Sequence, residues 1–242
     1  MNGTLYIVST PIGNLEDITL RALRILKEAD LVACEDTRQS RILLDHYKIS
    51  NQLTSFFEHN EIKKIPQMIA TLQSGKSVAV ISDSGTPTIS DPAFKLVREA
   101  RKEGIPVVPV PGANAALAAI SVSGLPTDSF VFEGFLPHKK GRQTAWKALA
   151  VEDRTIILYE SPYRVLKTLT EIEEYIGPRH VVIARELTKK FEEVLQGTPS
   201  ELRSHFEKHE PRGEFVILIT GKKYFEKHLE ERFHAIMCGI IG

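Results

Sequence analysis

The sequence predicts an α/β protein in which short strands alternate with helices and form largely parallel, helix-covered sheets. Three observations support this prediction. Runs rich in β-branched residues alternate with amphipathic stretches of about 10–15 residues. A chain of 242 residues can bury a sizeable core, in one large domain or two small ones. Its content of 42% hydrophobic and 26% charged residues is typical of a soluble protein.

The first elements follow from hydrophobic periodicity. Residues 4–9 (TLYIVS) predict a strand, and residues 18–29 predict a helix because apolar side chains recur there on one helical stripe. That stripe consists of Leu20, Leu23, Leu26 and Ala29. A second strand is expected over residues 30–34, a second helix over 38–47 and a third strand over 76–82.

Residues 91–104 predict a helix that has its own start and stop signals. Asp91 is the expected cap, the proline that follows it lies in the first turn, and Gly104 comes just after the end. Residues 105–110 (IPVVPV) predict a strand, and its prolines favour a sheet edge or a strand end. Residues 113–124 are rich in small side chains, which is typical of a helix that packs closely against a sheet.

The second half of the chain repeats this alternation. Its expected strands are residues 129–133, 154–159, 180–184 and 214–220, and its expected helices are residues 141–150, 163–176 and 199–208. We therefore expect an N-terminal α/β domain over residues 1–120 and a C-terminal α/β domain over 121–223. Residues 224–242 form a tail of unknown role that has the pattern of an amphipathic helix.

Composition excludes several classes of protein. No apolar run approaches the ~20 residues that span a membrane, and the N-terminus has no basic segment before its apolar run, so a cytoplasmic location is expected. Two cysteines, Cys34 and Cys238, cannot form a disulfide framework, and no His/Cys cluster predicts a metal site. The net charge of zero argues against strong non-specific binding of nucleic acid, although it allows a local basic patch.

Polar loops follow nearly every predicted strand. They are residues 9–14 (STPIGN), 35–38 (EDTR), 82–92 (SDSGTPTISDP), 111–116 (PGANAA), 159–164 (YESPYR) and 184–190 (ARELTKK). Each loop alone can be ordinary turn chemistry. Because ligands bind beyond the carboxyl ends of parallel strands, the six loops together predict a cleft for a polar small molecule. The chain lacks the glycine-rich dinucleotide fingerprint, the phosphate-binding P-loop and the GxSxG nucleophile motif.

The motifs in these loops resemble those of the tetrapyrrole-methylase superfamily. The resemblance covers residues 5–221 and rests on TPIGNLEDITLRAL, ACEDTR, SDSGTPTISDP, PGANA, FEGFLP, YESPYR, ARELTK and GEFVILITG, which occur in the family's order. The motifs TPIGN, EDTR and YESPYR resemble the branch that acts on ribosomal RNA. Two positions depart from the usual pattern: Ser84 replaces a common alanine, and Gln39-Ser40 replaces His-Thr.

The resemblance implies a fold, a cofactor and a reaction. The fold is two α/β domains with a cofactor cleft between them, in a homodimer. The cofactor is S-adenosyl-L-methionine, and the reaction is methylation of the ribose 2′-oxygen of a cytidine in 16S rRNA of the small ribosomal subunit. The residues implied to bind the cofactor are Pro11, Ser82, Asp83, Gly85, Thr86, Pro87, Asn114, Ala115, Tyr159, Glu160 and Leu187.

Elementary chemistry suggests how the loop at residues 82–87 would serve this cofactor. Asp83 can accept hydrogen bonds from an ammonium or from ribose hydroxyls, and the alternative is that it caps its own turn. Gly85 allows close approach of the backbone, and Pro87 stiffens the turn.

A ribose hydroxyl is a weak acid, so a base should assist the reaction. The candidates are Glu35, Asp36, Glu186 and Lys189. Lys189 would need its pKa lowered by burial or by a cationic neighbour such as Lys190 or Arg185. The alternative for the EDTR motif is a structural ion pair with Arg38.

Residues 138–147 (HKKGRQTAWK) form a basic segment. Lys139, Lys140 and Arg142, with Arg38 from the EDTR motif, are expected to bind RNA phosphates. Trp146 can either stack on a base or lie in the core, and the core is favoured.

Two other functions compete with RNA methylation. One is a methyltransferase of the same superfamily acting on a porphyrinoid ring, which would require an apolar, aromatic-lined cleft. The other is a non-catalytic ribosome-binding module that keeps the cofactor pocket for stability. Turnover on RNA discriminates among the three.

Overall fold

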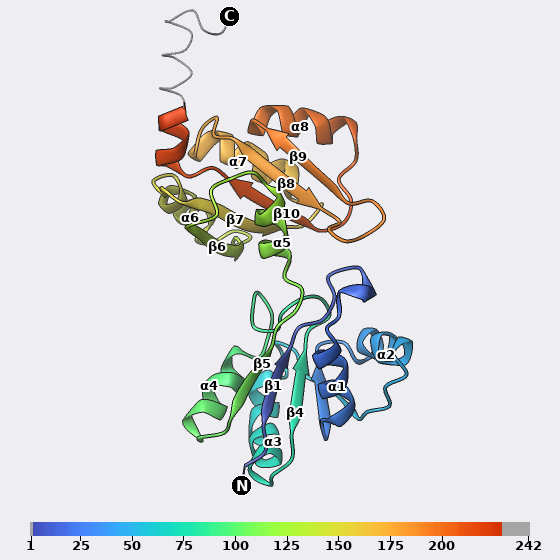
Figure 1. The fold of residues 1–242 in the computed structure, drawn as a ribbon. Coiled ribbons are helices and arrows are strands. Elements are labelled where there is room, and N and C mark those ends of the chain that lie inside the picture. The colour runs from blue at the N-terminus through green and yellow to red at the C-terminus, as the bar shows by residue number, and fades with distance from the viewer. Residues whose placement is uncertain (1, 229–242) are drawn as a thin grey trace, which may run out of the picture. The chain divides into compact units, whose positions relative to one another are not determined.

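The computed structural model describes residues 2–228, which form two compact units with the boundary between Asn114 and Ala115. Each unit contains one five-stranded sheet with its own helices (Figure 1). The expected boundary after residue 120 is wrong, because it falls inside a helix, α5 (Ala115–Val122), that packs on the second sheet. Of the expected tail over residues 224–242, residues 224–228 belong to a helical segment that begins at residue 222. Residues 229–242, including Cys238, lie outside the described residues.

The first unit contains a fully parallel sheet with the strand order β3-β2-β4-β1-β5. Its strands are β1 (Leu5–Val8), β2 (Leu31–Cys34), β3 (Leu53–Ser55), β4 (Val78–Ile81) and β5 (Val107–Val110). Its helices are η1 (Leu15–Asp17), α1 (Leu20–Glu28), α2 (Thr37–His46), α3 (Glu61–Gln73) and α4 (Phe94–Lys102). β5 lies at the sheet edge, as its prolines predict.

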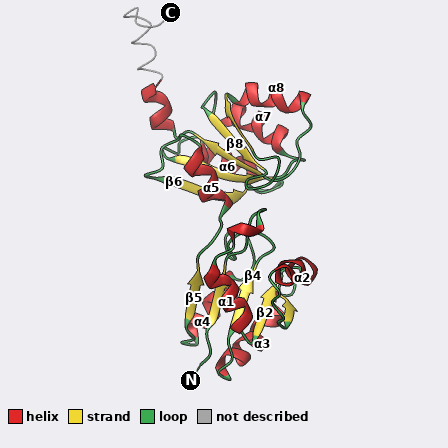
Figure 2. Cartoon of the chain, turned by 45° about the vertical axis from the view of Figure 1, so that its right-hand side comes forward, coloured by secondary structure: helices red, strands yellow, loops and turns green. Residues whose placement is uncertain are grey.

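Helices cover both faces of this sheet (Figure 2). In β4 the side chains of Val78 and Val80 pack with α3 and α4, whereas Ala79 and Ile81 pack with α1 and α2. Burial on both faces explains why β4 is apolar at every position instead of alternating.

The second unit contains a mixed sheet with the order β6-β7-β10-β8-β9. Its strands are β6 (Phe130–Phe135), β7 (Thr155–Glu160), β8 (Val181–Arg185), β9 (Glu193–Gly197) and β10 (Phe215–Ile219). β6 and β7 are parallel, but β10 is antiparallel to both of its neighbours, and β8 pairs with β9 in an antiparallel hairpin. The expectation of a largely parallel sheet is therefore wrong for this half. An apolar run indicates burial of a strand and not its direction.

Four helices of the second unit divide between the faces of its sheet. α5 packs on one face, and α6 (Arg142–Leu149), α7 (Val165–Tyr175) and α8 (Pro199–Lys208) pack on the other. Ala116 and Ala119 of α5 are buried against β7, β8 and β10, so the small residues allow a close approach, as the sequence predicts.

Some local expectations fail in the first unit. α4 begins at Phe94, three residues later than expected, after Ala93 in a left-handed conformation (φ 95°). Asp91 is therefore a loop residue rather than a helix cap. Leu20 is 86% exposed, so the buried face of α1 is Ala22, Ile25 and Leu26 instead of the expected stripe. In the same unit, β3 and α3 were not predicted, and in the second unit β9 was not predicted.

The close packing of α5 yields a stability prediction. Ala119→Leu forces extra methyl groups against the sheet and should lower the free energy of unfolding by about 1–3 kcal/mol. Denaturant unfolding measures this change. Val122→Ala on the exposed side of the same helix is the control and should cost less than about 0.5 kcal/mol. Equal effects of the two substitutions would contradict the packing.

Candidate functional site

Loops at the carboxyl ends of β1 and β4 are tied together by hydrogen bonds. The backbone N–H of Thr10 donates to the Gly85 carbonyl (2.8 Å), and its hydroxyl donates to the Ser82 carbonyl (3.2 Å). The hydroxyls of Ser9 and Thr86 share a hydrogen bond of 2.9 Å. These contacts fix the turn at residues 82–86 above the end of β1.

The loop after β5 joins the same assembly. The Thr86 hydroxyl donates to the Ala113 carbonyl (3.1 Å). Gly85 has φ +80°, and a Cβ there would lie 3.3 Å from Ile12 Cγ2, so both conformation and space favour glycine. Pro11, Ser82 and Pro87 are buried, whereas Asn114 and Ala115 are half-buried. Of the residues expected to bind a cofactor, the structure thus places those from β1, β4 and β5 in one contiguous region.

The continuation of this loop has unusual backbone geometry. Thr88, Ser90 and Ala93 have φ of 77°, 66° and 95°, a region that costs about 1–3 kcal/mol for a non-glycine residue. A buried carboxylate, Glu61 of α3, holds the end of the loop by accepting from the Ala93 N–H (3.1 Å) and pairing with Lys95 (3.1 Å). Glu61 could not be found in this way, because the candidates came from loops that follow predicted strands. It is instead the first residue of α3, a helix that was not predicted.

Three carboxylates influence one another at the ends of β2 and β4. Burial and the charges of Asp83 and Glu58 raise the pKa of Glu35. Asp83 is exposed as a residue, but partial loss of hydration is the main reason that its pKa is raised, although its Oδ1 accepts from the Asp36 N–H (3.1 Å). Burial raises the pKa of Asp91 to about 6, with contributions from the charges of Glu35 and Asp83. Asp91 is a site candidate that the sequence analysis treated only as a helix cap.

Asp36 behaves differently from these three carboxylates. Hydrogen bonds from the Arg38 side chain (2.7 and 3.1 Å) and from the Arg38 backbone lower the pKa of Asp36 to about 2. Asp36 is also the cap of α2. The structural ion pair that the sequence analysis left open is therefore present between these two residues.

A titration experiment tests the coupling among the carboxylates. Asp83→Asn removes a negative charge and should lower the pKa of both Glu35 and Asp91. Glu58→Gln is the matched control and should lower only the pKa of Glu35. Carboxyl ¹³C chemical shifts followed from pH 3 to 8 measure both values. An Asp91 pKa near 4 in the unaltered protein would contradict the burial described here.

In the second unit, Lys189 lies in an anionic environment. Its Nζ is 2.8 Å from Glu186 Oε1 and 3.2 Å from Glu214 Oε2. Burial favours the neutral amine, but the bonds and charges of the two glutamates outweigh it and raise the pKa of Lys189. The expectation that Lys189 serves as a base with a lowered pKa is therefore wrong. Arg185, the proposed cationic neighbour, instead pairs with Glu193 (2.5 Å).

Glu186 is held as a carboxylate. Burial opposes ionisation, but hydrogen bonds from Lys189 and the Glu214 N–H lower its pKa overall. Its φ of 51° and that of Thr188, 67°, show the same non-glycine left-handed geometry as the loop after β4. A Cβ at Gly213 would lie 2.2 Å from Glu186 Oε1, so glycine there leaves room for this side chain.

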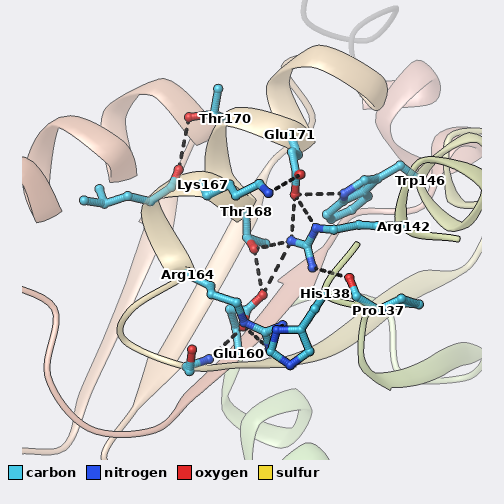
Figure 3. A network of polar contacts seen from close by, with 12 residues as sticks. Pro137, His138, Arg142, Trp146, Glu160, Arg164, Lys167, Thr168, Thr170 and Glu171 are labelled. Atoms are coloured by element: carbon cyan, nitrogen blue, oxygen red, sulfur yellow. Dashed lines mark hydrogen bonds and ion pairs between the residues drawn. The ribbon is translucent and has the colours of Figure 1, made fainter. Parts of the chain in front are cut away.

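Arg142 is the centre of a buried polar network (Figure 3). It is 4% exposed, and its guanidinium lies 2.6 Å from Glu171 Oε2 and 3.6 Å from Glu160 Oε2. It also donates to the Thr168 hydroxyl (2.7 Å). The expectation that Arg142 binds RNA is therefore wrong, because its charge is neutralised inside the protein.

Both carboxylate oxygens of Glu160 are used in this network. Oε1 accepts from Arg164 (2.7 Å) and from the Ser161 N–H (2.8 Å), and Oε2 accepts from Thr168 (2.7 Å). The Glu160 side chain thus holds the YESPYR turn, and the expected contact of this residue with a cofactor stays a prediction. Trp146 is fully buried and donates to Glu171 (3.1 Å), which confirms the core alternative.

The remaining candidates of this unit lie on or near its surface. Lys139 and Lys140 are exposed. They line a groove of about 730 Å³ between residues 138–144 and α7. Tyr159 accepts a hydrogen bond from the Ala116 N–H (3.2 Å), and Leu187 packs against the same core cluster.

The buried network yields a second stability prediction. Arg142→Met leaves Glu160 and Glu171 without their shared cation and should lower the free energy of unfolding by about 3–5 kcal/mol. Lys139→Met on the neighbouring exposed loop is the control and should change it by less than about 0.5 kcal/mol. Denaturant unfolding at pH 7 compares them. Similar small losses would show that Arg142 is not buried as described.

Two further features are not found among residues 2–228. None of their helices has the length and apolar character needed to span a membrane. Within residues 2–228, no group of three or more His, Cys, Asp or Glu side chains is placed to hold a metal ion.

A parallel sheet whose strand ends carry a polar and acidic rim, followed by a mixed-sheet unit, defines a two-unit α/β protein. Its candidate small-molecule site lies at the carboxyl ends of the parallel strands. Residues 4–203 match the family of tetrapyrrole (corrin/porphyrin) methylases, and the chain belongs to this family. The family resemblance inferred from the motifs is thereby confirmed, as is the two-domain α/β fold class.

Similar proteins include several from bacteria named ribosomal RNA small subunit methyltransferase I. The one from Thermotoga maritima is 51% identical over 221 residues, covering 91% of this chain and 100% of the relative. The one from Pseudomonas aeruginosa is 49% identical over 223 residues, covering 90% of this chain and 79% of the relative.

Solved structures share the fold at low sequence identity. Diphthine synthase superimposes with a TM-score of 0.72 at 16% identity, covering 91% of this chain and 90% of that chain. Uroporphyrin-III C-methyl transferase from Thermus thermophilus, solved in complex with S-adenyl homocysteine, has a TM-score of 0.63 at 19% identity. That match covers 92% of this chain and 99% of the other.

Proposed function

We propose that this protein is an S-adenosyl-L-methionine-dependent methyltransferase that modifies the ribose 2′-oxygen of a cytidine in 16S rRNA. The observation that carries the proposal is identity of about half, over about nine-tenths of the chain, with relatives named ribosomal RNA small subunit methyltransferase I. Structural neighbours acting on other substrates are far less similar in sequence.

The rim at the end of the first sheet fits the proposed cofactor. Asp83, Glu35 and Asp91 concentrate negative charge beside a turn that Gly85 and Thr86 hold rigidly. Raised pKa values mean that the carboxylates repel one another or lack solvation, so a cation among them would be stabilised. When bound, S-adenosylmethionine supplies a methyl group on a cationic sulfonium. Asp83, Ser82 and the backbone of residues 84–86 would hold it.

The pKa shifts also distinguish the stronger from the weaker candidates for the general base. Asp36, with a pKa of about 2, holds a proton too weakly at neutral pH, and Lys189 is kept protonated by two carboxylates. Glu35 has a raised pKa, which matches it better to accepting a proton from a ribose hydroxyl. Asp91 joins Glu35 as a second candidate, since burial raises its pKa to about 6, toward neutral pH.

The same proposal includes the setting in which the protein acts. We expect a cytoplasmic homodimer with the small ribosomal subunit as its partner. The porphyrinoid alternative is less well supported because the strand ends of the first unit are polar and acidic, where an aromatic-lined cleft would be expected.

Transfer of a labelled methyl group tests the proposal. The protein, labelled S-adenosylmethionine and isolated small subunits that lack the modification should give one 2′-O-methylcytidine per 16S rRNA. Nuclease digestion and mass spectrometry locate the product. Cofactor binding without transfer to RNA would overturn the proposal in favour of a porphyrinoid substrate or a binding module.

Two variants separate cofactor binding from RNA binding in that assay. Asp83→Ala should weaken cofactor binding about 10-fold or more, because bonds to a charged group contribute about 1.5–3 kcal/mol. Lys139→Ala combined with Lys140→Ala should leave cofactor affinity within about twofold and weaken binding to the subunit. Calorimetry and filter binding measure the two affinities, and parallel losses in both variants would contradict this division.

A further inference from the structure

The most exposed aromatic side chain of the described second unit lies in the YESPYR turn. Tyr163 is 96% exposed, although a tyrosine usually buries much of its ring. The sequence analysis considered Trp146 as a base-stacking residue, but that ring is fully buried. Phe135 and Phe191 are exposed to a smaller extent, at 53% and 69%, so Tyr163 presents the most accessible ring in the described part of this unit to another molecule.

The backbone beneath Tyr163 is held on both sides. Preceding it, the Ser161 N–H donates to Glu160, and following it, Arg164 forms an ion pair with the same carboxylate (2.7 Å). The Arg164 and Val165 N–H groups both donate to the Ser161 carbonyl (3.1 Å each). A ring on a fixed turn loses little conformational freedom when it binds a partner.

The same network joins this turn to the basic loop. An Arg164 nitrogen lies 3.2 Å from His138 Nδ1 (Figure 3). Tyr163 directly precedes Arg164 in the chain, and Lys139 directly follows His138. Arg142, which follows the loop, donates to the Pro137 carbonyl just before it (3.3 Å) and so ties its two ends together. One network of hydrogen bonds and ion pairs thus holds both the turn that carries Tyr163 and the loop that carries Lys139 and Lys140.

The groove beside the loop carries net positive charge. Lys139 and Lys140 line it from the loop, and Lys167 lines it from α7 with a side chain that is 63% exposed. The lining also includes Arg142 and two acids, Glu171 and Glu174, and Glu171 pairs with both Arg142 (2.6 Å) and Lys167 (3.8 Å). Four cations therefore stand against two carboxylates. This charge suits a phosphate backbone.

We propose that Tyr163 stacks on an unpaired base of the RNA substrate while Lys139, Lys140 and Lys167 contact the phosphates of the same strand. The inference rests on the proposed function, since it assigns residues to the RNA of that reaction. Aromatic platforms bind single-stranded nucleic acid because splayed bases expose their faces, which a duplex hides. Glu160 and Arg142 are positioning residues that hold the platform and the lysine loop in register.

Affinity and its salt dependence distinguish the two contributions. Tyr163→Leu keeps an apolar side chain without the aromatic face, and it should weaken binding to small subunits and to a single-stranded, cytidine-containing oligoribonucleotide by about 5- to 150-fold. The slope of log affinity against log salt should be unchanged. Tyr163→Phe is the matched control and should bind within about twofold of the unaltered protein. Because Tyr163 is exposed, neither change should alter the melting temperature.

The lysines should show the opposite pattern. Each of Lys139→Ala, Lys140→Ala and Lys167→Ala should reduce the salt slope by about 0.7, the value for one phosphate contact of a single strand. Lys208→Ala, on exposed α8 outside the groove, should leave the slope unchanged. A fully paired RNA duplex should show no effect of Tyr163→Leu.

Each outcome decides the inference separately from the reaction. If the unaltered protein methylates 16S rRNA but Tyr163→Leu binds RNA as tightly, the inference fails and the proposed function stands. If Tyr163→Leu instead changes the sedimentation of the protein and not its RNA affinity, the ring covers a second copy of the chain and the inference fails. If the protein binds RNA through Tyr163 but transfers no methyl group, the proposed function fails and the stacking site stands. Absence of any RNA binding overturns both.

Discussion

Four parallel strands of the first unit, β2, β4, β1 and β5, end at the same edge of their sheet, and the candidate site depends on this constraint. Parallel pairing places residues that are far apart in sequence within hydrogen-bonding distance, as with Ser9, Thr86 and Ala113. The strained φ values after β4 persist because these contacts and the buried Glu61 hold the loop at both ends. Rigid placement of such a loop is what binding a small, folded cofactor requires.

Electrostatics gives the rim its chemical character. Asp36 and Asp83 are joined by a single hydrogen bond, yet their pKa values shift in opposite directions, because Arg38 pairs with Asp36 and burial dominates at Asp83. Neighbouring carboxylates can therefore serve different purposes on one sheet edge: Asp36 caps and anchors α2, while Asp83, Glu35 and Asp91 keep a capacity to bind a cation or a proton.

The second unit buries the charged side chain of an arginine, Arg142. Taking Arg142 out of water is costly, and Glu171, Glu160, Thr168 and the Pro137 carbonyl together offset that cost. The network also ties the YESPYR turn to the basic loop through Arg164 and His138, which are 26 residues apart in the chain. The buried Arg142 and its partners therefore fix the positions of two surface segments, one that carries lysines and one that carries the exposed Tyr163.

The sequence by itself determined the alternation of strands and helices, the parallel first sheet and the family. These properties rest on local signals: the apolar runs of β4, the prolines of β5, and motifs whose order in the chain is itself the evidence. The loops at residues 9–14, 82–92 and 111–116 could be expected to meet because parallel strands deliver their carboxyl ends to one edge.

Tertiary structure alone decided the direction of the strands in the second sheet, the role of Arg142 and the identity of the exposed aromatic residue. Arg142 and Lys139 read alike in sequence, three residues apart in one basic run, but the face of α6 on which Arg142 lies places it against Glu171 of α7. The raised pKa values of Asp91 and Lys189 could not be predicted from the sequence either, since a pKa depends on burial and on charges brought close by the fold. Sequence encodes which groups are present, whereas their protonation and accessibility arise from neighbours that are distant along the chain.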